Sequence, residues 1–173
     1  VFSSIPTINA IVQGRKVFDP RDSSTAFSDN PVLCLRDYLT NTRYGKGLDT
    51  SLLDDTTFSA AANACDTTNE TFSGSGVQIK RFQCNAVINT NQTLFNNTKV
   101  LLAGFQGMMP FQNGTYRVFV EDDYTATFSF TESNIISGFK IQGSQKGNKF
   151  NRVTAKFVNP ETNYQADAVI FPD

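Results

Sequence analysis

The side chains that could do chemistry in this chain are carboxylates and cysteines, because the sequence contains no histidine. Without that general base, Ser-His-Asp and Cys-His nucleophilic arrangements are excluded. Paired carboxylates occur at Asp54 and Asp55, and again at Glu121, Asp122 and Asp123. Glycoside hydrolysis needs two carboxyl groups facing each other across a cleft, and sequence neighbours on a turn do not provide that geometry. The sequence therefore predicts no catalytic residues and no enzyme.

The acidic run of Glu121, Asp122 and Asp123 follows a predicted β-hairpin, and we interpret it as a solvated turn. A weak Ca²⁺ site is the alternative, since carboxylates clustered in a loop suit a hard cation. The spacing does not match an EF-hand loop. Both interpretations stay open, and no cofactor or structural metal is predicted.

The three cysteines, Cys34, Cys65 and Cys84, are far apart in the sequence and odd in number. They form no CxxC pair, and no histidine is present to complete a zinc site. We interpret them as free thiols in a protein that is assembled in a reducing cytoplasm.

Charge and hydropathy exclude two further classes of partner. The 15 basic and 16 acidic residues give a net charge of −1, so the chain has no long-range field that would recruit a polyanion. The densest basic cluster is interpreted as a solvated strand and loop, and we predict no sequence-specific nucleic-acid binding; it comprises Lys140, Lys146, Lys149 and Arg152. No apolar run approaches the roughly 20 residues of a membrane span. Because the chain begins at Val1 without a signal-like segment, we expect a portion of a longer polypeptide.

The first half of the chain predicts short helices. Strand-like runs over 5–12 and 15–18 precede a polar loop over 19–29. Asn30 is a strong N-cap and Pro31 suits the first helical position, so a helix is predicted over 31–40. A second helix is predicted over 54–65, with an apolar face of small residues. The polar segment 67–76 then suggests a boundary between portions 1–70 and 71–173.

The second half predicts mostly antiparallel strands after one more helix, over 93–107. Asn113-Gly114 is the preferred type I′ turn, so 109–111 and 116–120 should form a hairpin. The other predicted strands are 77–88, 126–130, 135–141 and 152–158. The phenylalanines in these runs are interpreted as core, with contacts to a partner subunit as the alternative; they are Phe119, Phe128, Phe130, Phe139, Phe150 and Phe157. The fold class is α+β.

The sequences of several segments, and their order along the chain, resemble the lambda-type phage tail tip attachment protein, also called the central fibre or baseplate hub protein. The resemblance is specific over 15–66 and continues near the C-terminus. Its segments are Ile5-Pro6, 17–21 (VFDPR), 25–31 (TAFSDNP), 33–40 (LCLRDYLT), Tyr44-Gly45, 58–66 (FSAAANACD), 81–88 (RFQCNAVI), 114–119 (GTYRVF), 149–160 (KFNRVTAKFVNP) and Tyr164-Gln165. Phe27 departs from it, because the family usually carries Trp there; the large apolar side chain is kept.

The resemblance implies architecture and not catalysis. Members of that family form a trimeric hub in the virion, under the tail tube. They contact the distal tail protein and the tape measure protein, and carry the central fibre. On this basis we expect an internal portion of a hub that closes the distal end of the tail. A receptor- or glycan-binding tip domain is the second hypothesis, which predicts exposed aromatic side chains beside Asn and Asp on one loop face. A cell-wall hydrolase is the third, which requires two facing carboxylates.

Overall fold

The computed structural model describes residues 10–70, 76–122, 125, 128–143, 150–159, 162 and 164–171. Contacts between residues divide the chain into two compact units, Val1–Tyr124 (unit 1) and Thr125–Asp173 (unit 2). The division therefore falls after Tyr124, whereas the sequence suggested a boundary near residue 70. The reason is that the β3–β4 strand pair, Thr68–Glu70 with Gln78–Lys80, joins the two sides of residue 70 by backbone pairing.

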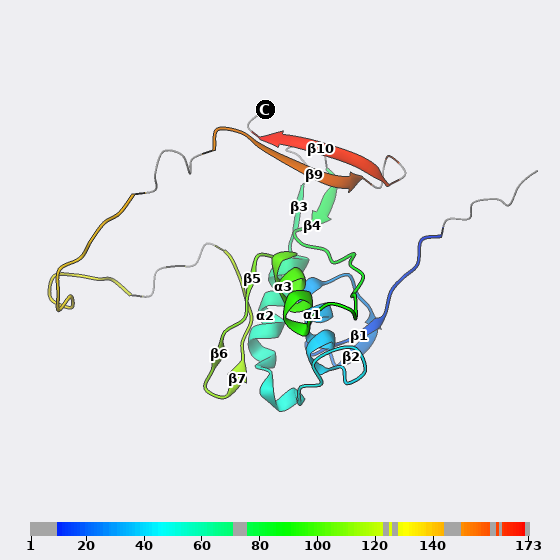
Figure 1. Ribbon diagram of the computed structural model, residues 1–173, viewed down its shortest axis with the longest axis horizontal. Helices are drawn as coiled ribbons and strands as arrows, with labels where there is room; N and C mark the ends of the chain where they lie inside the picture. The colour runs from blue at the N-terminus through cyan, green and yellow to red at the C-terminus, as the bar shows by residue number, and fades with distance from the viewer. Residues whose placement is uncertain are drawn as a thin grey trace, which may run out of the picture. The chain divides into compact units, whose positions relative to one another are not determined.

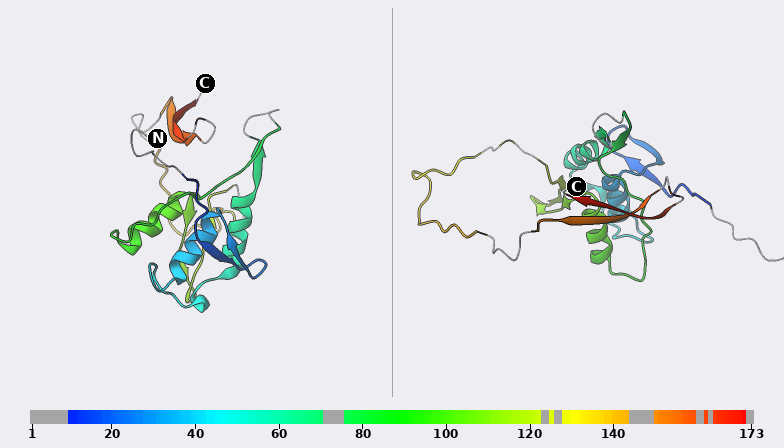
Figure 2. Two further views of the ribbon diagram at one scale, coloured as in Figure 1. Left: turned by 90° about the vertical axis from the view of Figure 1, so that its right-hand side faces the viewer. Right: turned by 90° about the horizontal axis from the view of Figure 1, so that it is seen from above.

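Unit 1 is a group of helices surrounded by short antiparallel strand pairs (Figures 1 and 2). Helix α1 contacts both α2 and α3, and α2 also contacts β8. The helices are α1 (Pro31–Thr40), α2 (Asp55–Asp66), α3 (Leu94–Ala103) and the 3₁₀ turn η1 (Thr50–Leu52). The other strands are β1 (Lys16–Asp19) paired with β2 (Ser24–Phe27), β5 (Gly107–Met108) with β8 (Phe119–Val120), and β6 (Phe111–Gln112) with β7 (Thr115–Tyr116). The expected α+β class is confirmed.

Cap residues set the beginnings of α1 and α2, as the sequence predicted. The Asn30 side chain accepts hydrogen bonds from the amides of Val32 and Leu33, at 3.0 and 3.4 Å. Asp54 does the same for Thr56 and Thr57. Each cap satisfies amides that the first helical turn leaves without a partner. The helices predicted over 31–40 and 54–65 are thus confirmed to within one residue.

The core of unit 1 lies between the three helices and β8. Tyr38, Phe58 and Phe105 are its largest fully buried side chains. Small residues on α2 let α1 approach closely, since Ala61, Ala62 and Cys65 are all buried. The buried Asn97 of α3 donates to the Tyr38 hydroxyl at 3.1 Å and to the Asn89 carbonyl at 3.0 Å. A polar contact therefore complements apolar packing between α1 and α3.

The hairpin predicted at Asn113-Gly114 is present as β6–β7. Asn113 has φ of 52° and Gly114 has φ of 83°. Positive φ at both central residues defines the type I′ turn, whose twist matches that of the flanking strands. The local sequence signal was sufficient here because the turn depends on only two residues.

Several predicted elements of unit 1 differ from the structure. The strand predicted over 77–88 is limited to β4. The backbone amides that follow β4 bond to carbonyls at the end of α2 and just before α1, and not to a neighbouring strand. Arg81 donates to the Thr67 carbonyl, Phe82 to that of Cys65 and Cys84 to that of Asp29. The loop predicted over 19–29 contains β2, and the helix predicted over 93–107 ends at Ala103. Residues 10–12 form no strand, and 5–9 lie outside the described residues.

Unit 2 contains one antiparallel hairpin among its described residues. Strand β9 (Val153–Asn159) was predicted, and its partner β10 (Gln165–Phe171) was not. Seven residue pairs run from Gln165 opposite Asn159 to Phe171 opposite Val153. The strands predicted over 126–130 and 135–141 are wrong for residues 128–130 and 135–141, which pair with no other strand; 126 and 127 lie outside the described residues.

Substitution of Asn30 by Ala should weaken unit 1 strongly. It removes the cap of α1 and also the Asn30 Nδ2 donor, which bonds to the Ala62 carbonyl of α2 at 2.9 Å. Loss of a cap costs about 1 kcal/mol, and a buried carbonyl without a donor costs about 1–3 kcal/mol. We expect the free energy of unfolding to fall by about 2–4 kcal/mol. Urea unfolding followed by the helical circular-dichroism signal measures it.

The matched control is Asn30→Ser, which keeps a capping oxygen but cannot donate to the Ala62 carbonyl in the same way. It should lose a smaller part of the stability. An Asn30→Ala chain as stable as the wild type would contradict the role given to this side chain.

Candidate functional site

The carboxylates of Asp54 and Asp55 are engaged in holding α2 in place. Arg117 Nε lies 2.8 Å from Asp54 Oδ2, and this hydrogen bond lowers the pKa of the Asp54 carboxyl. Arg36, whose side chain is almost fully buried, binds both Asp55 oxygens, at 2.8 and 3.0 Å. Asp55 thus joins α2 to α1 through Arg36, and Asp54 joins the start of α2 to the segment before β8 through Arg117.

In the acidic run after β8, the Asp122 carboxylate is paired. Arg81 Nη1 lies 2.9 Å from Asp122 Oδ2, and Nη2 donates to the Glu121 carbonyl oxygen at 3.1 Å. Asp123 lies outside the described residues. Within the described ranges no group of three or more His, Cys, Asp or Glu side chains could hold a metal ion. The calcium hypothesis for Glu121, Asp122 and Asp123 therefore has no structural support from Glu121 and Asp122.

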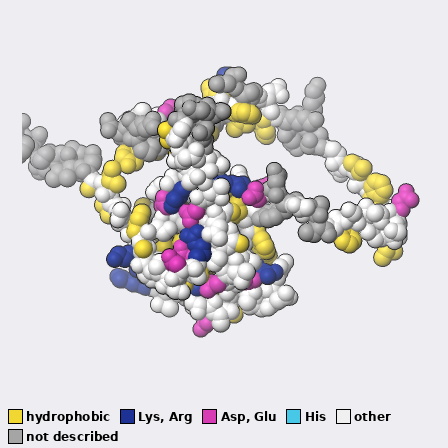
Figure 3. All heavy atoms as spheres, turned by 180° about the vertical axis from the view of Figure 1, so that it is seen from behind, with side chains coloured by type: hydrophobic (Ala, Val, Ile, Leu, Met, Phe, Trp, Pro, Cys, Tyr) yellow, Lys and Arg dark blue, Asp and Glu magenta, His cyan; other side chains and the backbone are white. Residues whose placement is uncertain are grey.

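The surface of unit 1 shows mixed charge. Figure 3 shows basic and acidic side chains interspersed on one face, which does not form a patch of a single sign. Of the basic cluster that the sequence identified, Lys146 and Lys149 lie outside the described residues. Over the part of the chain that is described, no helix has the length and apolar character needed to cross the bilayer.

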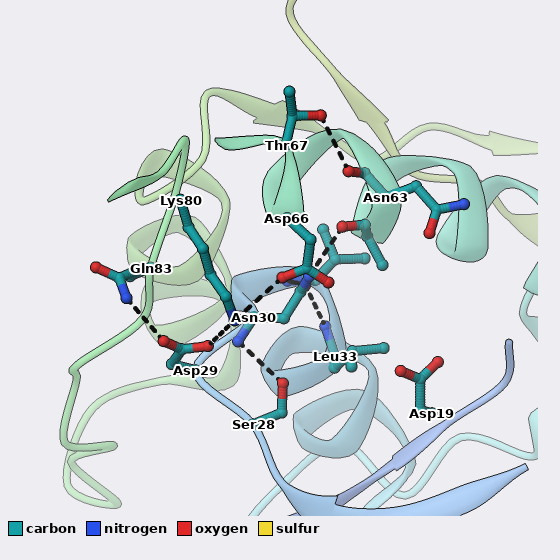
Figure 4. Close-up of polar contacts among 12 residues, drawn as sticks. Asp19, Ser28, Asp29, Asn30, Leu33, Asn63, Asp66, Thr67, Lys80 and Gln83 are labelled. Carbon is teal, nitrogen blue, oxygen red and sulfur yellow. Dashed lines mark hydrogen bonds and ion pairs between the residues drawn. The ribbon is translucent and has the colours of Figure 1, made fainter. Parts of the chain in front are cut away.

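An ion-pair network connects the approach of α1, the end of α2 and strand β4 (Figure 4). Lys80 Nζ lies 2.6 Å from Asp29 Oδ1 and 3.3 Å from Asp66 Oδ1, and the Gln83 amide donates to Asp29 Oδ2 at 2.8 Å. Burial opposes ionisation of Asp29, but the Lys80 and Gln83 hydrogen bonds prevail and lower its pKa. The hydrogen bond to Asp29 raises the pKa of Lys80.

The same network extends from Asp66 to the β1–β2 hairpin. Arg21 Nη1 lies 2.9 Å from Asp66 Oδ2, and Arg21 Nη2 lies 2.6 Å from Asp19 Oδ2. Hydrogen bonding from Arg21 lowers the pKa of Asp19. Acids and bases alternate along this chain of contacts, so it fixes elements together. It does not present the two facing carboxylates that the hydrolase hypothesis requires.

A mostly apolar cavity of about 710 Å³ opens beside α1 in unit 1. Its wall includes Val17, Tyr38, Leu101 and two cysteines, Cys34 and Cys84. At its rim, Arg15 pairs with Asp37 at 3.3 Å and the Tyr44 hydroxyl donates to Asp37. Burial and the bond to Asp37 raise the pKa of the Tyr44 phenol. The cavity can accept an apolar side chain or a small ligand. The Asp37 carboxylate in its lining is already paired with Arg15.

The hairpin of unit 2 is exposed at every described position of both strands except Asn159, which is half-buried. In an antiparallel pair, residues directly opposite each other share a face, so Val153 with Phe171 and Ala155 with Val169 lie on one side together with Phe157. We call these five residues the apolar hairpin face, which ends at Asp167, opposite Phe157. Its four larger side chains are 42–74% exposed. Lys156 lies on the opposite face.

The phenylalanines interpreted from sequence as core are mostly exposed. Phe119 is half-buried in unit 1, but Phe157 and the others lie open to solvent: Phe128, Phe130, Phe139 and Phe150. The core interpretation is wrong for these five, because unit 2 has no second layer among its described residues to cover them. Exposed apolar surface of this extent marks an interaction site.

Comparison with known proteins gives a distant relationship to a phage protein. No protein-family model matches the chain. The chain is 26% identical over 187 residues to the baseplate hub protein pb3 of Escherichia phage T5, with 98% of this chain aligned. The aligned region makes up 20% of pb3, so the chain spans about a fifth of its length. This distant homology supports a structural role in a phage tail or baseplate.

Sequence reasoning did not find the ion-pair network or the meeting of Cys34 with Cys84. Lys80 and Asp29 are 51 positions apart, and nothing periodic connects them. The sequence predicted only the local structure around each residue, a loop at Asp29 and a strand at Lys80.

The stability of unit 1 should fall in acid because of Asp29. A carboxyl whose folded pKa is lowered stabilises the fold above its unfolded pKa of about 3.9 and loses this contribution as the pH falls through the lowered value. Asp29→Asn should therefore cost about 1 kcal/mol near neutral pH, limited by solvent screening at Lys80. Its deficit relative to wild type should shrink as the pH falls below about 4. Urea midpoints at several pH values measure this.

Asp22→Asn is the control, since among the described residues Asp22 accepts from the amide of Ser24 in its own turn, and Asn can do the same. An Asp29→Asn chain with an unchanged deficit across the pH range would show that the Lys80 contact contributes no pH-dependent stability.

Proposed function

We propose that this chain is a structural portion of a phage baseplate hub that closes the distal end of the tail tube and links it to the central fibre. The distant homology to a baseplate hub protein supports it, as does the ordered resemblance over 15–66 to tail tip attachment proteins. The carboxylates of Asp54, Asp55 and Asp66 in unit 1 are engaged in structural pairs, which favours assembly over hydrolysis. The lambda-type assignment is part of the proposal.

The observation that carries the proposal is the apolar hairpin face. A two-stranded hairpin is marginally stable by itself in water, and three strands or a packed layer are needed for independent stability. Here Val169 and Phe171 are 57% and 74% exposed. Each strand also has an outer edge whose backbone groups can pair with another chain. A covering partner would bury this face and complete the unit.

The partner we propose first is further copies of this chain, arranged as a homotrimer around the tail axis in the virion. Contacts with the distal tail protein, the tail tube and the tape measure protein would follow from that position. A net charge of −1 suits closely packed subunits, because unpaired charge is costly to bury. Assembly would take place in the host cytoplasm.

A receptor- or glycan-binding tip is the second candidate. The segment 128–143 exposes Phe128 and Phe130, whose rings lie 5.1 Å apart, and Asn134 is in the same segment. The exposed rings are what a sugar site would use, whereas the Asn134 amide already bonds to the Thr131 amide and the Ser129 carbonyl. A chain that stays monomeric and binds a host glycan would favour this function and contradict the hub.

Val169→Glu should disrupt assembly. It places a carboxylate opposite Ala155, between Phe171 and the Asp167 that already lies on this face. Burying that charge without a partner would weaken association by at least about 3 kcal/mol, or more than 100-fold. Native mass measurement of the 173-residue chain should show a trimer for wild type and a monomer for the variant.

Thr154→Glu is the matched control, because it adds the same charge to the adjacent position on the opposite face, beside Lys156. It should remain trimeric. Equal assembly of both variants would remove the apolar hairpin face from the interface, and a wild-type chain that is monomeric at high concentration would contradict the trimer.

A further inference from the structure

Two cysteines that are distant in sequence meet at the wall of the unit 1 cavity. The Cys34 amide donates to the Asn30 carbonyl at 3.1 Å, in the first turn of α1. The Cys84 amide donates to the carbonyl of the neighbouring residue, Asp29, at 2.7 Å. The Gln83 side chain and Lys80 bind the Asp29 carboxylate, so several bonds hold the Cys84 segment in place beside α1.

The two thiols interact with each other in an asymmetric way. The Cys34 thiol donates to the Ser28 carbonyl at 3.7 Å. Its contact with Cys84, with a hydrogen bond from the Ala86 amide, lowers the pKa of Cys84 against the opposing effect of burial. The same contact, followed by burial, raises the pKa of Cys34. Cys84 is therefore the better nucleophile, since the thiolate is the reactive form. Cys34 is the adjacent thiol that can resolve a mixed disulfide.

The surroundings favour a redox pair over a metal site. Across the described residues no third acidic, histidine or cysteine ligand completes a metal-binding group. Both side chains are partly exposed and line the 710 Å³ cavity, through which a small disulfide can reach them. Cys65 is fully buried in the core, and burial raises its pKa to about 12, so it serves as an internal reference.

We propose that Cys34 and Cys84 form a reversible disulfide in the folded chain. The bond would close a loop of about 50 residues and fasten the irregular segment after β4 to α1. It would form when the chain leaves a reducing compartment, whereas the thiols would stay reduced in the cytoplasm. The inference rests on unit 1 alone and is independent of the proposed function.

The reaction is thiol–disulfide exchange with a small-molecule disulfide such as oxidised glutathione. The Cys84 thiolate attacks one sulfur of the disulfide, forms a mixed disulfide and releases one glutathione thiolate. Cys34 then loses its proton and attacks the Cys84 sulfur, which releases the second glutathione. The protein loses two electrons and the reagent gains them, so two protein thiols and one disulfide become one protein disulfide and two small thiols.

The test is to equilibrate the wild-type 173-residue chain with graded ratios of oxidised and reduced glutathione, and then to count thiols after denaturation. Of the three thiols, one should remain in the oxidised chain, and a non-reducing peptide map should join the Cys34 and Cys84 peptides. The thermal midpoint should rise by at least about 5 °C on oxidation, because the cross-link restricts the unfolded chain. Cys65→Ser should behave as wild type, with no thiol left after oxidation.

Three results would overturn the proposal: three titratable thiols at every ratio, a bridge that includes Cys65, or stable glutathione adducts on Cys84 without ring closure. The wild-type measurement needs no substitution at either cysteine, so misfolding of a variant cannot obscure the outcome. Cys34→Ser should then trap the mixed disulfide on Cys84, which identifies the attacking sulfur.

Discussion

The side chain of Asn30 holds the two helices that organise unit 1 in a fixed relation. It is fully buried, accepts from the first amides of α1 and donates to the Ala62 carbonyl of α2 (Figure 4). A buried amide must satisfy both its donor and its acceptor, so the position of one helix fixes that of the other. Asp29 next to it receives Lys80, and its carbonyl receives the Cys84 amide. The segment after β4 is thereby attached to the same point.

The charged residues of unit 1 are used in a consistent way. Arg21, Arg36, Arg81 and Arg117 each bind a carboxylate that belongs to another element or segment. These pairs fasten strands and loops to the helices, which suits a part of a mechanical assembly. The apolar hairpin face of unit 2 has no such partner among the described residues. Unit 1 is held together by these pairs, although it also exposes apolar side chains such as Phe95 and Phe111. Unit 2 exposes the hairpin face that the proposed assembly would bury.

The elements that sequence predicted well are those that depend on neighbouring residues. Asn30-Pro31, Asp54 and Asn113-Gly114 determine a helix start or a turn within a few positions. The strand expected over 77–88 failed because alternation alone does not supply a partner, and its amides bond to residues far along the chain. The prediction that the phenylalanines form a core was wrong for a related reason. Apolar character indicates that a side chain is buried, but it does not indicate whether its own chain or a partner buries it. Contacts such as Lys80 with Asp29 have no local signature.

A density map of the intact tail tip would test whether this chain is an assembly part of a phage tail hub. We expect three copies in a ring at the distal end of the tail tube, with Val169 and Phe171 buried against a neighbouring chain. A single copy away from the tail axis, with the hairpin open to solvent, would contradict it.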